Sequence, residues 1–187
     1  MFGGGVVMLS AIGACVTVAG SIGAGYCLCR EKSERAAQLF LLGRMFEMTA
    51  GEIGYSRSFL PDIFSETGRR LGRAQKGASA ELGSVLVRAG ERMLDEKGQP
   101  VETIWKEEMG VFLKKLLLTA DEEREVLSFP DAVCYLDGER QKQAVERFAV
   151  IFRERAEEAL KKAGQEKRTV MAVSAACGML TALLLIR

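Results

Sequence analysis

The sequence contains no histidine, only three prolines and a single tryptophan among its 187 residues. Without histidine the chain cannot form a Ser-His-Asp triad, a Cys-His catalytic pair or a metal site with imidazole ligands. The scarcity of proline favours helices over a turn-rich all-β fold. The formal net charge of +1 gives no sign of a basic surface for nucleic acid, so we expect no nucleic-acid partner.

Sequence motifs for catalysis and cofactor binding are also missing. No G-x-x-x-x-G-K-[ST] loop is present, and the run Gly3-Gly4-Gly5 precedes an apolar stretch instead of a dinucleotide-binding helix. Acidic groups such as Asp121-Glu122-Glu123 leave a carboxylate-pair enzyme as an alternative, but acids at a helix start usually interact with the helix dipole. Cys134 is the one cysteine within residues 30–168, and a single cysteine cannot build a disulfide framework or a thiolate zinc site there. We therefore expect a protein that is not an enzyme, with no catalytic residue, no cofactor and no metal.

Charged side chains are absent from both ends of the chain. Residues 2–29 and 169–186 carry none, whereas residues 30–168 hold all 25 acidic residues and 25 of the 26 basic ones. A helix needs about 20 apolar residues to cross a bilayer core, so both runs are long enough to be transmembrane helices. A cleaved signal peptide is the alternative for the first run, but the positive segment that should precede its apolar core is missing.

The basic residues that flank the two runs predict the orientation of the chain. Arg30, Lys32 and Arg35 follow the first run, and the second run is preceded by Lys161, Lys162, Lys167 and Arg168. Because basic flanks stay on the cytoplasmic side of a membrane, we expect residues 30–168 to be cytoplasmic.

The central section shows apolar residues at helical spacing from end to end. Apolar stripes and breaking residues predict helices that begin near Ala36, Ser58, Ser79, Pro100 and Asp121, and a long last helix from about Asp137 to the second run. Thr119 to Glu122 has the spacing of a capping box, Pro130 ends or kinks the helix after it, and residues 72–77 read as a basic loop. The predicted fold is all-α, a bundle of about six helices between two terminal transmembrane helices.

Small residues recur every four positions within both apolar runs. Such rows allow helices to approach closely in a membrane, although small residues that merely face lipid are the alternative interpretation. The residues predicted to pack in this way are Gly13, Thr17, Ser21 and Gly25 in the first run, and Ser174, Gly178 and Ala182 in the second.

Three further features have a structural and a functional interpretation. Trp105 is either a core anchor or a hot spot for a partner. Asp137 either caps the last helix or contacts a partner. Cys27 and Cys29, at the end of the first run, are either small filler residues or a site of redox chemistry or palmitoylation.

Short motifs along nearly the whole chain resemble the stage III sporulation protein AB family. They comprise Glu52-Ile53-x-Tyr55, Ser58-x-Leu60-Pro61-Asp62, Trp105 after an acidic and apolar turn, and Asp137-x-x-x-Gln141. The chain departs from the family between residues 129 and 136, where Pro130 and Cys134 stand in place of two expected glycines.

The resemblance implies a scaffold of the channel complex between mother cell and forespore, in the mother-cell membrane around the forespore. Residues 30–168 would then be similar to the platform domain of type II secretion systems. This domain would couple a secretion-type ATPase to other membrane proteins of the same complex. Tyr55, Asp62, Asp137 and Gln141 are the expected contact residues, and homo-oligomerisation stays open. The alternative is the same role in another type II secretion or pilus-like machine.

Overall fold

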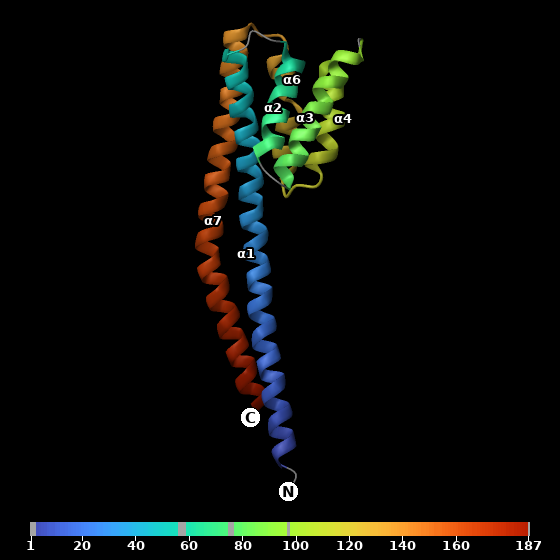
Figure 1. The fold of residues 1–187 in the computed structure, drawn as a ribbon. Coiled ribbons are helices and arrows are strands. Elements are labelled where there is room, and N and C mark those ends of the chain that lie inside the picture. Colours follow the sequence, from blue (N-terminus) through green and yellow to red (C-terminus); the bar gives the residue numbers. More distant parts are fainter. Residues whose placement is uncertain (1–2, 56–58, 75–76, 97, 187) are drawn as a thin grey trace. The chain divides into compact units, whose positions relative to one another are not determined.

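The computed structural model describes residues 3–55, 59–74, 77–96 and 98–186. Within them it describes no side chains for residues 3–12, 14–15, 17–18, 21–22, 24, 28, 74 and 181–186. The described residues form seven helices and no strand, which confirms the all-α prediction. The helices, coloured along the chain in Figure 1, are α1 (Gly3–Tyr55), α2 (Leu60–Ala74), α3 (Ala78–Asp95), α4 (Val101–Leu113), α5 (Ala120–Leu127), α6 (Phe129–Val133) and α7 (Gly138–Ile186).

The chain divides into two compact units. One, which we call the terminal-helix unit, comprises Met1–Glu34 and Glu158–Arg187; the other, the central bundle, comprises Arg35–Glu157. The boundaries predicted at residues 29 and 169 stay predictions. Across the part of the chain that the structure describes, no helix is both long enough and apolar enough to cross a bilayer. The two predicted terminal spans are therefore not confirmed.

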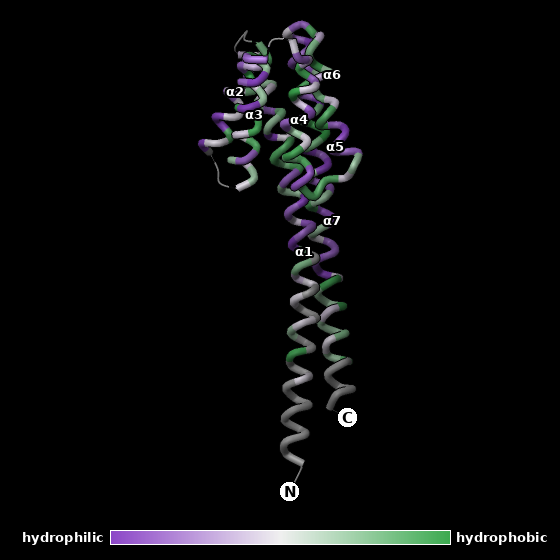
Figure 2. The backbone as a smooth tube through the Cα atoms, turned by 90° about the vertical axis from the view of Figure 1, so that its right-hand side faces the viewer, coloured by the Kyte–Doolittle hydropathy of each residue, from purple (hydrophilic) through white to green (hydrophobic). Residues whose placement is uncertain are grey.

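The central bundle is built on α1 and α7, which run antiparallel beside each other, and within the bundle hydrophilic and hydrophobic residues alternate along both helices (Figure 2). The two backbones come close at Gly43, where an added Cβ would lie 3.3 Å from the backbone nitrogen of Arg153. Near the end of α1, an added Cβ at Gly54 would lie 3.4 Å from the Lys142 side chain. The end of α1 therefore lies beside the start of α7.

Aromatic rings from five helices make the core of the central bundle. Phe129, from the short α6, is fully buried, and its ring centroid lies 4.9 Å from Phe46 of α1 and 5.3 Å from Trp105 of α4. Phe64 of α2 lies 4.9 Å from Trp105, and Phe148 of α7 meets Phe129 edge to face at 5.3 Å. Because rings at these separations attract each other beyond their burial, the cluster holds all five helices together.

Helices α2 and α3 touch through glycine. An added Cβ at Gly83 would lie 2.6 Å from the carbonyl oxygen of Gly68, and one at Gly68 would lie 2.5 Å from that of Gly83. A Cβ at Gly90 would reach the carbonyl oxygen of Pro61 at 2.5 Å. Only residues without a side chain allow two helix backbones to approach this closely.

The expected basic loop over residues 72–77 is wrong at its start. Gly72 and Arg73 belong to α2, which continues to Ala74. The reason is the same backbone contact, because an added Cβ at Gly83 would also lie 2.8 Å from the nitrogen of Gly72. Packing against α3 therefore keeps this turn helical, although its glycine content favoured a loop. The cap predicted at Ser58 lies outside the described residues.

The connection between α4 and α5 is fixed to α1 by polar side chains. Thr119 and Glu122 form the predicted capping box, with Glu122 Oε2 accepting from the Thr119 backbone nitrogen at 2.7 Å. The other oxygen of Glu122 pairs with Arg35 of α1 at 2.7 Å. Gln38 of α1 accepts a hydrogen bond from the Leu117 backbone nitrogen at 2.6 Å. After this connection α5 ends at Leu127, and Pro130 lies in the first turn of the separate α6.

An arginine on α3 gathers three glutamates. Arg92 donates to Glu96 at 2.8 Å, to Glu107 at 2.8 Å and to Glu108 at 3.0 Å, so it ties α3 to α4. The hydrogen bond from Arg92 lowers the pKa of Glu96 below its ordinary value. A carboxylate with a lowered pKa stabilises the folded state above that ordinary value, 4.5, and the contribution is lost as pH falls through the folded pKa.

We therefore predict that Arg92→Met lowers the thermal midpoint at pH 7 and that the difference from wild type shrinks toward pH 3. Loss of the charge-assisted contacts to three glutamates is the physical reason. Thermal unfolding followed by circular dichroism across this pH range measures it. Arg124→Met, which removes a guanidinium from an exposed pair with Asp121 at 2.5 Å, is the control and should change the midpoint little. A midpoint difference for Arg92→Met that stays constant from pH 7 to pH 3 would contradict the assignment.

Candidate interaction surfaces

The four predicted contact residues lie where three helices of the central bundle begin or end. Tyr55 is the last residue of α1 and is 90% exposed. Asp62 is exposed in the first turn of α2. Asp137 and Gln141 lie at the start of α7. The structure thus places these residues at helix termini, and their contact with a partner stays a prediction.

Tyr55 and Asp62 lie on either side of one buried carboxylate. Glu52 is 7% exposed and pairs with Arg70 of α2 at 2.6 Å. It lines a shallow pocket of about 440 Å³ with Tyr55, and another of about 290 Å³ with Asp62. The Glu52–Arg70 pair thus fixes the end of α1 against α2, beside the exposed ring of Tyr55.

Asp137 and Gln141 have structural roles at the start of α7. One carboxylate oxygen of Asp137 accepts a hydrogen bond from the Arg140 backbone nitrogen at 3.1 Å, which is the helix-capping role expected from the sequence. The side-chain amide of Gln141 donates to the carbonyl oxygen of Val133 at 3.1 Å. Gln141 therefore joins α6 to α7, while the exposed Asp137 carboxylate keeps room for a further contact.

Two exposed aromatic side chains near these residues were not predicted as contacts. Phe59 is 82% exposed before α2, and Tyr135 is 84% exposed after α6. The hydroxyl of Tyr135 donates to Glu102 at 3.2 Å, and this bond to a carboxylate raises the pKa of Tyr135. No periodic pattern marks either residue, because both lie between helices.

Cys134 is unsuited to nucleophilic chemistry. It is half-buried, and burial together with the negative charges of Glu102 and Asp131 raises the pKa of its thiol to about 11. Since the thiolate is the reactive form, this thiol stays protonated at neutral pH.

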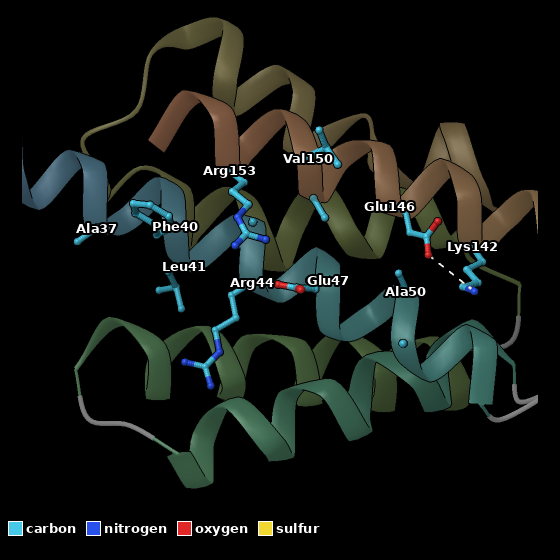
Figure 3. Close-up of a pocket in the computed structure, with 13 residues that line it drawn as sticks. Ala37, Phe40, Leu41, Arg44, Glu47, Ala50, Lys142, Glu146, Val150 and Arg153 are labelled. Carbon is cyan, nitrogen blue, oxygen red and sulfur yellow. Dashed lines mark ion pairs between the residues drawn. The ribbon is translucent and has the colours of Figure 1, made fainter. Parts of the chain in front are cut away.

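A groove runs along α1 and α7 within the central bundle (Figure 3). Its volume is about 790 Å³. The apolar residues that line it are Ala37, Phe40, Leu41, Gly43, Ala50, Gly51, Ala149 and Val150, and the charged ones are Arg44, Glu47, Lys142, Glu146 and Arg153. The sequence pattern predicted only which sides of these helices are buried. No residue of the groove was predicted as a binding site.

Small residues predicted to pack in a membrane meet within the terminal-helix unit. Gly25 of α1 is buried, and an added Cβ there would lie 2.7 Å from the hydroxyl of Ser174 and 3.4 Å from the Val170 side chain of α7. Gly178 is also buried, and Gly13 is half-exposed. The side chains of Thr17, Ser21 and Ala182 lie outside the described residues. Gly25 and Ser174 are thus brought together, while packing within a membrane stays a prediction.

Within its described residues the chain is all-helical, with exposed aromatic side chains at helix ends and one groove along α1 and α7. The model of the stage III sporulation protein AB family matches residues 10–186. Because this match covers almost the entire sequence, the chain belongs to that family and is a stage III sporulation protein. Neither the curated proteins nor the solved structures yield a match.

Proposed function

We propose that this protein is a non-enzymatic membrane scaffold of the sporulation channel complex between mother cell and forespore. Residues 2–29 and 169–186 are its membrane spans, and residues 30–168 are the cytoplasmic platform that couples a secretion-type ATPase to other membrane proteins of the complex. The distribution of charge carries this proposal, since every acidic residue lies between the two apolar runs. Family membership supplies the sporulation setting.

The end of the central bundle supports an interaction role. A monomeric protein seldom leaves several aromatic rings almost fully in solvent, and interfaces are enriched in such rings. Tyr55, Phe59 and Tyr135 are 82–90% exposed, and the carboxylates of Asp62 and Asp137 are exposed beside helix termini. We assign the contact with the ATPase to this set.

The membrane part of the proposal predicts a labelling pattern. In a variant with its own cysteines replaced by serine, Ala78→Cys at the exposed start of α3 should resist a membrane-impermeant maleimide in intact cells. The same cysteine should react once the cells are permeabilised, because residues 30–168 face the cytoplasm. Labelling in intact cells would reverse the orientation, and a chain that leaves the membrane fraction in carbonate would exclude the spans.

The platform part predicts a loss of binding from single exposed residues. We expect Tyr55→Ala and Asp137→Asn to weaken capture of the purified ATPase by the full chain in detergent at least tenfold. Asparagine also caps helices, so Asp137→Asn removes the charge and keeps α7 intact. Val111→Ala, at a side chain 66% exposed on α4, is the control and should leave capture unchanged.

Two outcomes separate the parts of this prediction. If the wild-type chain captures no ATPase, in detergent or in reconstituted membranes, the platform role is wrong. If wild type and both variants bind equally well, only the assignment of the contact residues is wrong.

A further inference from the structure

The α1–α7 groove exposes apolar side chains that the central bundle leaves uncovered. Phe40 is 38% exposed and Val150 is 53% exposed, although they lie on helices whose other sides are fully buried. Between them the floor consists of small residues, with Gly43 and Ala50 buried. An apolar strip with a floor of small residues lets the backbone of a further helix approach closely.

The charges of the groove are sorted into zones along its length. Lys142 lies beside the end of α1, where its ammonium pairs with Glu146 at 3.8 Å. The carboxylates of Glu146 and Glu47 follow, and the guanidinium groups of Arg44 and Arg153 come next (Figure 3). The order is therefore basic, acidic, basic.

These charges are available to a partner. Within the described residues Arg44 and Glu47 make no hydrogen bond or ion pair, and Arg153 has only a long contact with Glu157 at 3.9 Å. Exposed pairs at such distances contribute little to stability. A bound segment could therefore take over all of these charges at small cost to the fold.

We propose that the groove binds an amphipathic helix of another protein, with an acidic end placed against Arg44 and Arg153 and a basic end placed against Glu47 and Glu146. The apolar stripe of this helix covers Phe40 and Val150, so the helix becomes a third member beside α1 and α7. Glu146 and Arg153 are seven residues apart on α7, about 10 Å along a helix. The acidic and basic residues of the partner are therefore separated by one to two turns.

Charge disfavours one alternative occupant of the groove, a second copy of this chain that lies parallel to the first. Gly43 lies against the backbone of Arg153, so Arg44 and Arg153 occupy the same level of the bundle. A two-fold axis parallel to the helices would then place Arg44 of one copy opposite Arg153 of the other. Like charges facing across an interface oppose binding.

Two synthetic helical peptides of 18 residues test the proposal on the full chain in detergent. Both carry the same stripe of leucine and alanine. In the mixed peptide, glutamates border this stripe at one end and lysines at the other. In the all-lysine peptide, lysines border it at both ends. We expect the wild-type chain to bind the mixed peptide at least tenfold more tightly, as measured by fluorescence anisotropy. In the double variant Arg44→Glu with Arg153→Glu, the groove is acidic at positions 44, 47, 146 and 153. This variant should therefore prefer the all-lysine peptide by a similar factor.

A matched control changes arginines elsewhere. Arg69→Glu with Arg124→Glu alters the net charge equally at exposed side chains outside the groove and should keep the wild-type preference. Unchanged circular dichroism melting shows that the variants fold. The proposal is overturned if neither peptide binds, or if the groove variant ranks the peptides as wild type does. It is also overturned if sedimentation shows a wild-type dimer that the groove variant dissociates, because the occupant is then a second copy.

Discussion

Replacing Trp105 by alanine is expected to lower the free energy of unfolding by about 3–5 kcal/mol, the usual cost of removing a large buried ring. The side chain is fully buried, and its ring lies within 5.3 Å of Phe64 and Phe129. Its indole nitrogen donates to the carbonyl oxygen of Val126 at 2.9 Å. Truncation therefore leaves a cavity among aromatic rings and removes the indole hydrogen bond to a buried residue.

Two variants separate these effects when unfolding of the full chain is followed by circular dichroism. Trp105→Phe keeps a ring and removes the hydrogen bond, so its cost should stay near 1–3 kcal/mol. Val111→Ala, on the exposed side of the same helix, should change stability by less than about 0.5 kcal/mol. If Trp105→Ala leaves stability within that margin while reducing binding of the ATPase, Trp105 is a contact residue and its assignment to the core is wrong.

Trp105 shows which parts of the fold can be read from the sequence. Helical spacing of apolar residues places it on a buried face, and the structure confirms its assignment as a core anchor. The capping box at Thr119 and the cap at Asp137 were predicted as well. Such features depend on residues within one or two turns of each other, so local sequence contains what is needed to find them.

Features that depend on distant segments were missed. The separate helix α6 contains five residues, too few for a periodic pattern, yet its Phe129 joins the rings of four other helices. The exposed Phe59 and Tyr135 lie between helices, where no periodic pattern tells a buried aromatic ring from an exposed one. The groove escaped prediction because its walls come from residues 37–51 of α1 and 142–153 of α7, two segments that are about ninety residues apart in the sequence.

The contact between α2 and α3 is the sharpest case, because glycine in a helix normally signals weakness. Glycine lowers helix stability by about 1 kcal/mol relative to alanine, and this cost made the end of α2 look like a loop. At Gly83 the structure reverses the expected effect of alanine on stability, from a gain to a loss. The space that a Cβ needs there is occupied by the carbonyl oxygen of Gly68 at 2.6 Å. A backbone atom cannot rotate away as the end of a side chain can.

We therefore expect Gly83→Ala to destabilise the protein by about 3 kcal/mol or more, at the upper end of what overpacking costs. The thermal midpoint of the full chain should fall by roughly 10 °C, as measured by circular dichroism. Gly110→Ala is the matched control, because Gly110 also lies within a helix and an added Cβ there meets no described atom within 4 Å. That variant should gain up to about 1 kcal/mol from the better helix propensity of alanine. If both variants raise the midpoint, α2 and α3 are farther apart than the contact requires, and the glycines of this pair have no packing role.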